Sequence, residues 1–365
     1  MTIQANQKQH FYWLDTIRFI AAFMVLLSHG RNTFFLTFGD LPIEQQNIVT
    51  MAITMFQRMG HEAVIIFFVL SGFLVGGRVL ERIRTRTMNI CSYVIDRLSR
   101  IYPPLITAII FYFITSLVVP DISFSIQRAI GNLFNLQGIF CESLVSPFWS
   151  LSYEMWFYIL LGALAFTLTT KSHNKKYLGF FLFFVSTLVF VIGLKMHYLL
   201  IWLIGALSYL IRPSKKDSLV LWGAFFGFFI CCVFWQFSKD TRSLDFVFKS
   251  INKEILELIM AFMASLFIQQ VILFEPKNKL SIIIEKYIGK MANFSYTLYL
   301  SHRIVFLWIA AFILPKNTCS FTAIGLLYYG LILVITLVVC WLLYLISEKQ
   351  IPRIRKKLKE IFIHS

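Results

Sequence analysis

The stretch WLDTIRFIAAFMVLLSHGRNTFFL, residues 13–36, decides how the fold is interpreted. It is long enough to cross a bilayer once as a helix, since about 20 apolar residues span the hydrocarbon core. It also contains ionisable side chains, which are costly inside a membrane and therefore indicate a function beyond anchoring. A helix presents Arg18 and His29 about 20° apart around its axis and about 16 Å apart along it. The ionisable residues of the stretch are Asp15, Arg18, His29 and Arg31.

The composition indicates a polytopic membrane protein. Hydrophobic residues make up 58% of the chain, charged residues only 14%, and the mean hydropathy is +0.73. Soluble domains carry roughly a quarter charged residues. The first apolar run is too long for a cleavable signal peptide and lacks a small-residue cleavage site, so we expect it to stay in the mature protein. The net charge of +16 is distributed as membrane topology requires, so we expect no nucleic acid as a partner.

Apolar runs predict ten membrane-spanning helices, and hence an all-α polytopic bundle with both termini on one side. The connections on the N-terminal side hold 23 of the 34 Lys and Arg residues, and the opposite side holds eight. By the positive-inside rule, both termini are predicted to be cytoplasmic. The ten runs are 13–36, 61–79, 101–120, 148–169, 177–194, 198–211, 218–237, 254–274, 294–314 and 322–346.

The sequence divides into a leader, a membrane domain and a tail. We expect a cytoplasmic leader over 1–12, a transmembrane domain over 13–346 and a basic cytoplasmic tail over 347–365. A solvated or headgroup-binding tail is favoured over a ligand site. The six cysteines lack metal-ligand spacing, so no metal site is expected. They are interpreted as small apolar residues, with a disulfide between Cys141 and Cys319 as the alternative.

Depth along two predicted spans places an imidazole and a carboxylate at a similar level. His29 lies about 24 Å above the start of the first span, and Glu154 lies about 10 Å below the outer surface in the fourth. If they meet, the carboxylate would orient the ring and stabilise its protonated form, as a general base acting on a hydroxyl requires. The alternative is a buried structural pair without a catalytic task.

Three arginines are predicted near the cytoplasmic surface. Arg97 and Arg100 share a helix face, and Arg18 begins on the same side of the membrane. Their fork-shaped guanidiniums would suit a phosphate-rich cytosolic ligand. The positive-inside bias explains Arg97 and Arg100 equally well, but it does not explain Arg18, which lies within a span.

Other polar residues lie in three apolar runs. In FFVLSGFLVGGR, residues 67–78, small residues favour close helix packing, and Ser71 is a weaker candidate for a nucleophile. In PFWSLSYEMWFYILLG, residues 147–162, the aromatic side chains suit an interfacial belt or stacking on sugar rings. The ninth run adds a polar cluster that includes Tyr299 and His302.

Together these segments resemble the acyltransferase 3 family of integral membrane acyltransferases, which includes bacterial O-antigen and cell-wall polysaccharide O-acetyltransferases. Each motif alone is weak, but their order, spacing and shared topology are specific. The resemblance extends from about residue 11 to residue 346. The motifs are Leu14-Asp15 with Arg18 and His29, FFVLSGFL at 67–74, Arg97-x-x-Arg100 followed by Ile101-Tyr102-Pro103, FWSLSYE at 148–154 and SYTLYLSH at 295–302.

The resemblance implies a ten-span enzyme of the bacterial inner or plasma membrane. It would transfer an acyl group, usually acetyl from cytosolic acetyl-CoA, to a hydroxyl of an external glycan such as O-antigen or exopolysaccharide. Acetyl-CoA would be a co-substrate, with no permanently bound cofactor. The implied site residues are His29 and Glu154 as catalytic groups, Arg18, Arg97 and Arg100 as acyl-CoA contacts, and Asp15, Ser71, Ser152, Tyr153 and His302 as supporting groups.

The sequence departs from the family pattern at two places. Relatives often have two glutamates where this chain has only Glu154, and Ser301-His302-Arg303 replaces the usual late continuation. Some relatives also carry an extracytoplasmic hydrolase-like domain, for which this sequence has no room, so we expect transfer directly to the acceptor or to a separate partner. An acyl-enzyme on Ser71, Ser152 or Tyr153 stays open.

A transporter of a glycan or small organic anion is the alternative function, because intramembrane ionisable residues also form substrate paths and proton relays. The absence of repeated halves and paired broken segments weighs against it. A structural scaffold would leave the buried charges unexplained. The expected partners are an acyl-CoA donor, a glycan acceptor and the lipid bilayer, and a homo-oligomer stays open.

Overall fold

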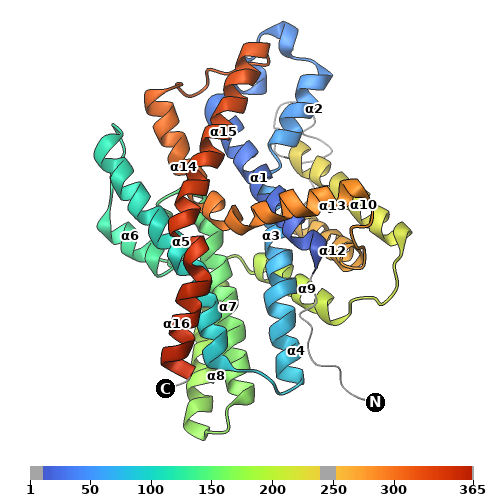
Figure 1. The fold of residues 1–365 in the computed structure, drawn as a ribbon, viewed down its shortest axis with the longest axis vertical. Coiled ribbons are helices and arrows are strands. Elements are labelled where there is room, and N and C mark those ends of the chain that lie inside the picture. Colours follow the sequence, from blue (N-terminus) through green and yellow to red (C-terminus); the bar gives the residue numbers. More distant parts are fainter. Residues whose placement is uncertain (1–10, 239–251, 364–365) are drawn as a thin grey trace.

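The computed structural model describes residues 11–238 and 252–363, which form a bundle of α-helices (Figure 1). The predicted all-α membrane bundle is thereby confirmed. The main helices are α1 (Tyr12–Phe34), α2 (Ile48–Gln57), α3 (Gly60–Ser71), α4 (Arg78–Arg84), α5 (Ile90–Val118), α6 (Ile126–Leu133), α7 (Trp149–Thr169), α8 (His173–Ile192), α9 (Met196–Leu210), α10 (Ser218–Phe237), α12 (Lys253–Val271), α13 (Lys279–Ile284), α14 (Ser295–Phe312), α15 (Ala323–Ile346) and α16 (Ile351–Ile363).

Each of the ten predicted spans coincides with a helix or a continuous helical segment. Within the described ranges, eight segments are long and apolar enough to cross a membrane. The two remaining spans correspond to α9, which has only 15 residues, and to α14, which carries the polar SYTLYLSHR sequence. Each of the ten runs found by hydropathy is therefore helical in the structure, although two of the helices lack the length or apolarity of an ordinary span.

A π-helical segment, Gly72–Gly77, joins α3 to α4 and packs against α9. A Cβ atom on Gly72 would lie 2.0 Å from the Trp202 carbonyl oxygen, and one on Gly205 would lie 2.2 Å from the Val69 carbonyl oxygen. Only glycine permits such an approach, because any side chain would overlap the opposite backbone. The close packing predicted from the small residues of this run is therefore confirmed, and it fixes Trp202 beside Ser71.

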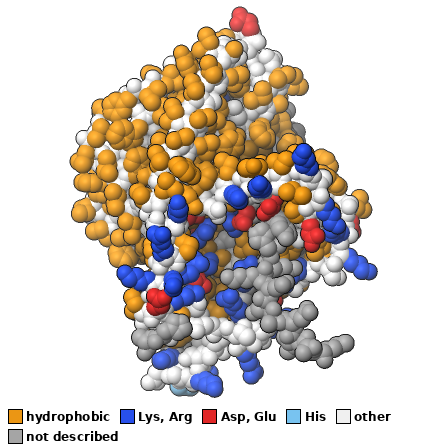
Figure 2. Space-filling view, in the orientation of Figure 1, with side chains coloured by type: hydrophobic (Ala, Val, Ile, Leu, Met, Phe, Trp, Pro, Cys, Tyr) orange, Lys and Arg blue, Asp and Glu red, His pale blue; other side chains and the backbone are white. Residues whose placement is uncertain are grey.

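Charged and apolar side chains occupy different parts of the visible face. Figure 2 shows hydrophobic side chains over the upper left of the view, where Figure 1 places α5, α14 and α15, and many Lys and Arg side chains lower down. A mainly apolar surface is expected for helices that face lipid, and basic residues gather where a bundle leaves the bilayer. The predicted cytoplasmic location of both termini stays a prediction.

The C-terminal segment is a helix packed on the bundle. Asp96 of α5 accepts ion pairs from Arg355 Nε at 3.3 Å and from Lys359 Nζ at 2.9 Å, and Arg355 Nε also lies 3.3 Å from Ser99 Oγ. These contacts align α16 with α5. The tail is thus helical over 351–363 and paired with α5 through its charges, while most of its side chains stay exposed or half-buried. The expectation of a solvated or headgroup-binding tail stays a prediction.

The alternative disulfide is wrong. Cys141 and Cys319 are both free thiols. Cys141 lies in the turn between α6 and α7, where its backbone forms an isolated β-bridge with Gln137. The backbone of Cys319 forms an isolated β-bridge with Phe35, at the end of α1. The two loops are held by separate backbone contacts, so sharing a predicted side of the membrane did not bring the thiols together.

Candidate functional site

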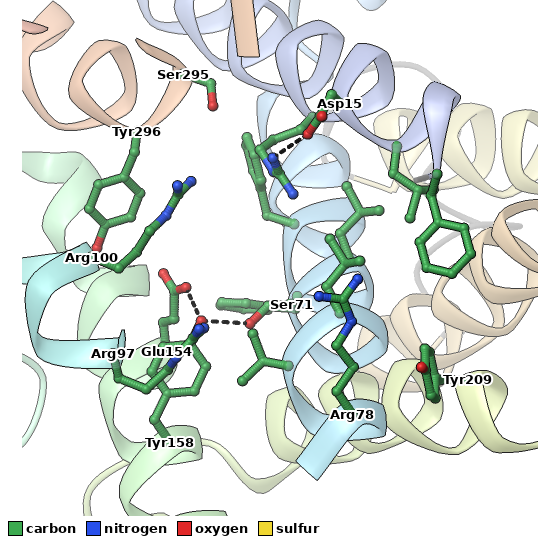
Figure 3. Close-up of a pocket in the computed structure, with 18 of the residues that line it drawn as sticks. Asp15, Ser71, Arg78, Arg97, Arg100, Glu154, Tyr158, Tyr209, Ser295 and Tyr296 are labelled. Atoms are coloured by element: carbon green, nitrogen blue, oxygen red, sulfur yellow. Dashed lines mark hydrogen bonds and ion pairs between the residues drawn. The ribbon is translucent and has the colours of Figure 1, made fainter. Parts of the chain in front are cut away.

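A cavity of about 1120 Å³ lies between α1, the α3–α4 segment, α5, α7, α9, α14 and α16 (Figure 3). Its polar wall carries seven guanidiniums against three carboxylates, those of Asp15, Glu81 and Glu154. Such an excess of positive charge favours an anionic ligand, and guanidiniums match phosphate oxygens in geometry. The seven arginines are Arg18, Arg78, Arg82, Arg97, Arg100, Arg212 and Arg355.

The three arginines expected at a donor site all line this cavity. Arg18 pairs with Asp15 at 2.6 Å. The guanidinium of Arg97 lies 5.3 Å from the ring centroid of Tyr158, and that of Arg100 lies 5.9 Å from the ring of Tyr296. Because the two α5 arginines are one helical turn apart, they reach the cavity from the same face, as predicted.

Four further arginines of the cavity were not singled out from the sequence. Arg78 and Arg82 come from the α3–α4 segment, Arg212 follows α9, and Arg355 comes from α16. Each of these arginines lies near the end of a membrane helix or in the tail. The positive-inside rule therefore accounted for each of them as a residue that sets the membrane topology. The packing of α4, α9 and α16 brings these four side chains to the wall of one cavity.

Glu154 ends a chain of hydrogen bonds. The Tyr158 hydroxyl donates to Glu154 Oε1, and Ser71 Oγ lies 3.1 Å from the Tyr158 hydroxyl. Trp202 Nε1 donates to Ser71 Oγ at 3.1 Å. Figure 3 shows Ser71 turned towards Tyr158 and Glu154 across the cavity, so α3, α7 and α9 together position the carboxylate.

The predicted contact between His29 and Glu154 is wrong. His29 Nδ1 lies 2.7 Å from His302 Nε2, and the two rings stack with centroids 5.0 Å apart. Glu154 instead accepts from Tyr158 and lines the cavity, of which neither histidine is a wall. Depth along a helix fixed the level of each side chain, but not the direction in which it points. His29 faces α14, whereas Glu154 faces the cavity.

The histidine pair has a defined proton arrangement when both rings are neutral. His302 Nδ1 lies 2.8 Å from the Leu298 carbonyl oxygen, which can only accept, so this nitrogen carries a proton. His302 Nε2 then accepts, and His29 Nδ1 is the donor. The Nε2 of His29 therefore keeps a lone pair, which is the property that a general base needs.

Tyr299 lies beside both the cavity and the histidine pair. Its ring lines the cavity, its centroid lies 6.4 Å from that of His302, and its hydroxyl lies 2.6 Å from Ser150 Oγ. Ser150 is one helical turn before Glu154 on α7. Tyr299 thus links the cavity wall to the ring of His302 and to Ser150 of α7.

The other two predicted supporting residues face elsewhere. Ser152 Oγ donates to the Asn135 carbonyl at 2.9 Å, and the Tyr153 hydroxyl accepts from the Lys195 backbone N–H at 3.1 Å. Neither lines the cavity. Both hold connecting segments against α7, which makes them unsuitable carriers of a group delivered through the cavity.

A second buried polar cluster lies apart from the cavity. The carboxylate of Glu257 on α12 lies close to two imidazoles: Oε1 is 2.7 Å from His61 Nε2, and Oε2 is 2.9 Å from His197 Nε2. This cluster could not be predicted from the sequence, because its three ionisable residues belong to three different helices and share no motif. Across the described ranges, no group of three His, Cys, Asp or Glu residues is suited to hold a metal ion.

Fold and site together define a multi-pass membrane protein with an arginine-lined cavity between its helices. Residues 11–345 match the family described as an acyltransferase domain, acyltransferase 3. The match covers nearly the whole chain, so the protein belongs to this family and is a membrane acyltransferase. No curated protein and no solved structure matches the chain.

Proposed function

We propose that this protein is an O-acetyltransferase of the bacterial inner or plasma membrane, which moves acetyl from cytosolic acetyl-CoA to a hydroxyl of an external glycan. The observation that carries the proposal is the concentration of seven arginines around one cavity whose wall also holds Glu154. Acetyl-CoA combines several phosphates with a long neutral arm and a thioester. The family match favours an enzyme over the transporter alternative.

The donor phosphates bind the arginines, with Arg97 and Arg100 presenting adjacent guanidiniums from α5. The neutral arm of acetyl-CoA carries amide and hydroxyl donors. Glu154 is held with one oxygen on Tyr158, and its other oxygen accepts a hydrogen bond from that arm. The thioester then lies along the apolar end of the cavity, near Tyr299.

The glycan hydroxyl approaches from the side of the histidine pair. His29 Nε2 removes the hydroxyl proton, the oxygen bonds to the thioester carbonyl carbon, and the carbon–sulfur bond breaks. The proton passes to the departing thiolate, which completes coenzyme A. Because Tyr299 lines the cavity and lies beside His302, we infer that its side chain moves aside for the acceptor and the thioester to meet.

The test uses purified protein in lipid nanodiscs with radiolabelled acetyl-CoA and surface polysaccharide from the host as acceptor. We expect label on the polysaccharide, and a roughly tenfold weaker acetyl-CoA affinity for Arg97→Ala, as loss of a charge-assisted hydrogen bond predicts. Arg353→Ala is the matched control, because this arginine is exposed and outside the cavity. Unlabelled polysaccharide with the wild-type protein would refute the proposal.

A further inference from the structure

The hydrogen-bond chain from Trp202 to Glu154 has only one direction. An indole N–H can donate but not accept, so Trp202 Nε1 donates to Ser71 Oγ. A carboxylate can only accept, so the Tyr158 hydroxyl donates to Glu154. Tyr158 has a single hydroxyl proton, and therefore Ser71 must donate the remaining bond, to the Tyr158 oxygen. Every proton in the chain is assigned.

This polarity excludes two roles for the chain. It cannot conduct a proton away from Glu154, because its far end is an indole that does not accept one. Ser71 is also a poor nucleophile, since its proton is directed to Tyr158, which is no base, and the Trp202 N–H occupies one of its lone pairs. What remains is orientation of the carboxylate.

The surroundings keep the chain rigid. Backbone contact between the π-helical segment and α9 fixes the distance from Trp202 to Ser71. The buried Tyr93 hydroxyl donates to the Tyr158 carbonyl at 2.9 Å, and Arg97 lies against the Tyr158 ring. Contacts from the segment that carries Ser71, from α9 and from α5 thus restrict the rotamers of the side chains in the hydrogen-bond chain.

We propose that Ser71 and Tyr158 are positioning residues, which act through Glu154 to place the donor, and that Ser71 carries no acyl group. The inference rests on the proposed function. Residues that act only through a third residue lose their effect when it is removed, whereas independent residues have effects that multiply. The proposal therefore predicts complete coupling to Glu154.

A double-mutant cycle tests this coupling on both acetyl-CoA affinity and turnover. We expect Tyr158→Phe and Ser71→Ala each to reduce kcat/KM about tenfold in the wild-type background, and less than about twofold in Glu154→Gln. Ser71→Thr, which keeps the hydroxyl, should restore most of the loss. Tyr328→Phe and Ser186→Ala, at sites away from the cavity, are matched controls.

The outcomes separate this inference from the function on which it rests. Multiplying effects in the double variants, or an acetyl adduct on Ser71 by mass spectrometry, would overturn the positioning role while leaving the acetyltransferase intact. If the wild-type protein transfers no acetyl group, the proposed function fails, and the same cycle on acetyl-CoA affinity decides the coupling. Thermal unfolding of every variant identifies any that misfold.

Discussion

His29 is the residue on which the proposed chemistry depends most. In the structure its partner is a second imidazole instead of the expected carboxylate, and a neutral pair leaves Nε2 of His29 unprotonated. A carboxylate partner would stabilise the protonated ring more strongly. An imidazole partner fixes the ring and its tautomer without adding a negative charge beside an incoming anionic donor.

Replacing His302 should therefore impair His29 without touching the donor site. We expect His302→Ala to lower the rate of acetyl transfer about 100-fold, the range of a misplaced general base, with little change in acetyl-CoA affinity. His302→Gln, which offers both a donor and an acceptor, should retain more activity. His173→Ala, on the exposed start of α8, is the control. Equal losses in affinity and rate would contradict this role.

At the residue scale, relative positions could be predicted from the sequence where the residues belong to the same helix. The spacing of Arg97 and Arg100 was enough to predict that they lie on the same helix face, because both belong to α5. The partner of His29 depended on which face of α1 packs against α14, and helical depth carries no such information. Tyr158 was interpreted with its neighbours as part of an interfacial belt or a sugar-stacking surface, and Trp202 was not singled out, because aromatic residues are common in membrane helices.

At the scale of elements, the contact between α9 and the π-helical segment holds the carboxylate chain together. Gly72→Ala would place a Cβ atom 2.0 Å from a backbone oxygen of Trp202, so α9 must move. We expect a loss of about 1–3 kcal/mol of stability, the usual cost of overpacking, together with lower activity. Thermal unfolding in detergent measures the first effect.

The control for this change is Gly223→Ala in α10, because a Cβ atom there would meet nothing within 4 Å. Replacing an unconstrained helical glycine with alanine should be neutral or slightly stabilising. If Gly72→Ala unfolds at the same temperature as the wild type and keeps full activity, then the close contact does not determine the position of Trp202.

α16 is the element whose position was least predictable from the sequence. Its contact with α5 brings Arg355 into the cavity wall, while Arg353 on the same helix stays exposed. We expect Arg355→Ala to weaken acetyl-CoA binding several-fold, and Arg353→Ala to have no effect. Equilibrium binding with labelled acetyl-CoA measures both. Identical affinities in the two variants would return α16 to a purely structural role.

The positions of the elements were predictable because hydropathy reports local composition. The arrangement of α16 was not, because an amphipathic basic helix after a membrane span can lie on lipid or on protein with the same sequence pattern. In the structure, Asp96 of α5 pairs with Arg355 and Lys359 of α16 and contributes to holding the two helices together. A pairing between segments that are distant in the chain cannot be recognised from the local sequence of either segment.

For the whole molecule, the central claim is that donor and acceptor reach one reaction centre from opposite sides of the membrane. In the proposed function, the arginine-lined cavity receives the donor and the histidine pair receives the acceptor, and Tyr299 lies beside both. Both termini are predicted to lie on the cytoplasmic side of the membrane, the side from which the arginine-lined cavity would receive the donor. Reporter fusions to each terminus should therefore be cytoplasmic, and an external terminus would invert the proposed direction of transfer.

The most direct measurement follows labelled acetyl across sealed membrane vesicles. Inside-out vesicles that contain host polysaccharide in their lumen receive radiolabelled acetyl-CoA from outside, and right-side-out vesicles receive the same addition. We expect labelled lumenal polysaccharide in the inside-out vesicles only, and no label there for His29→Ala. Label that appears only when acetyl-CoA and polysaccharide are on the same side of the membrane would contradict it.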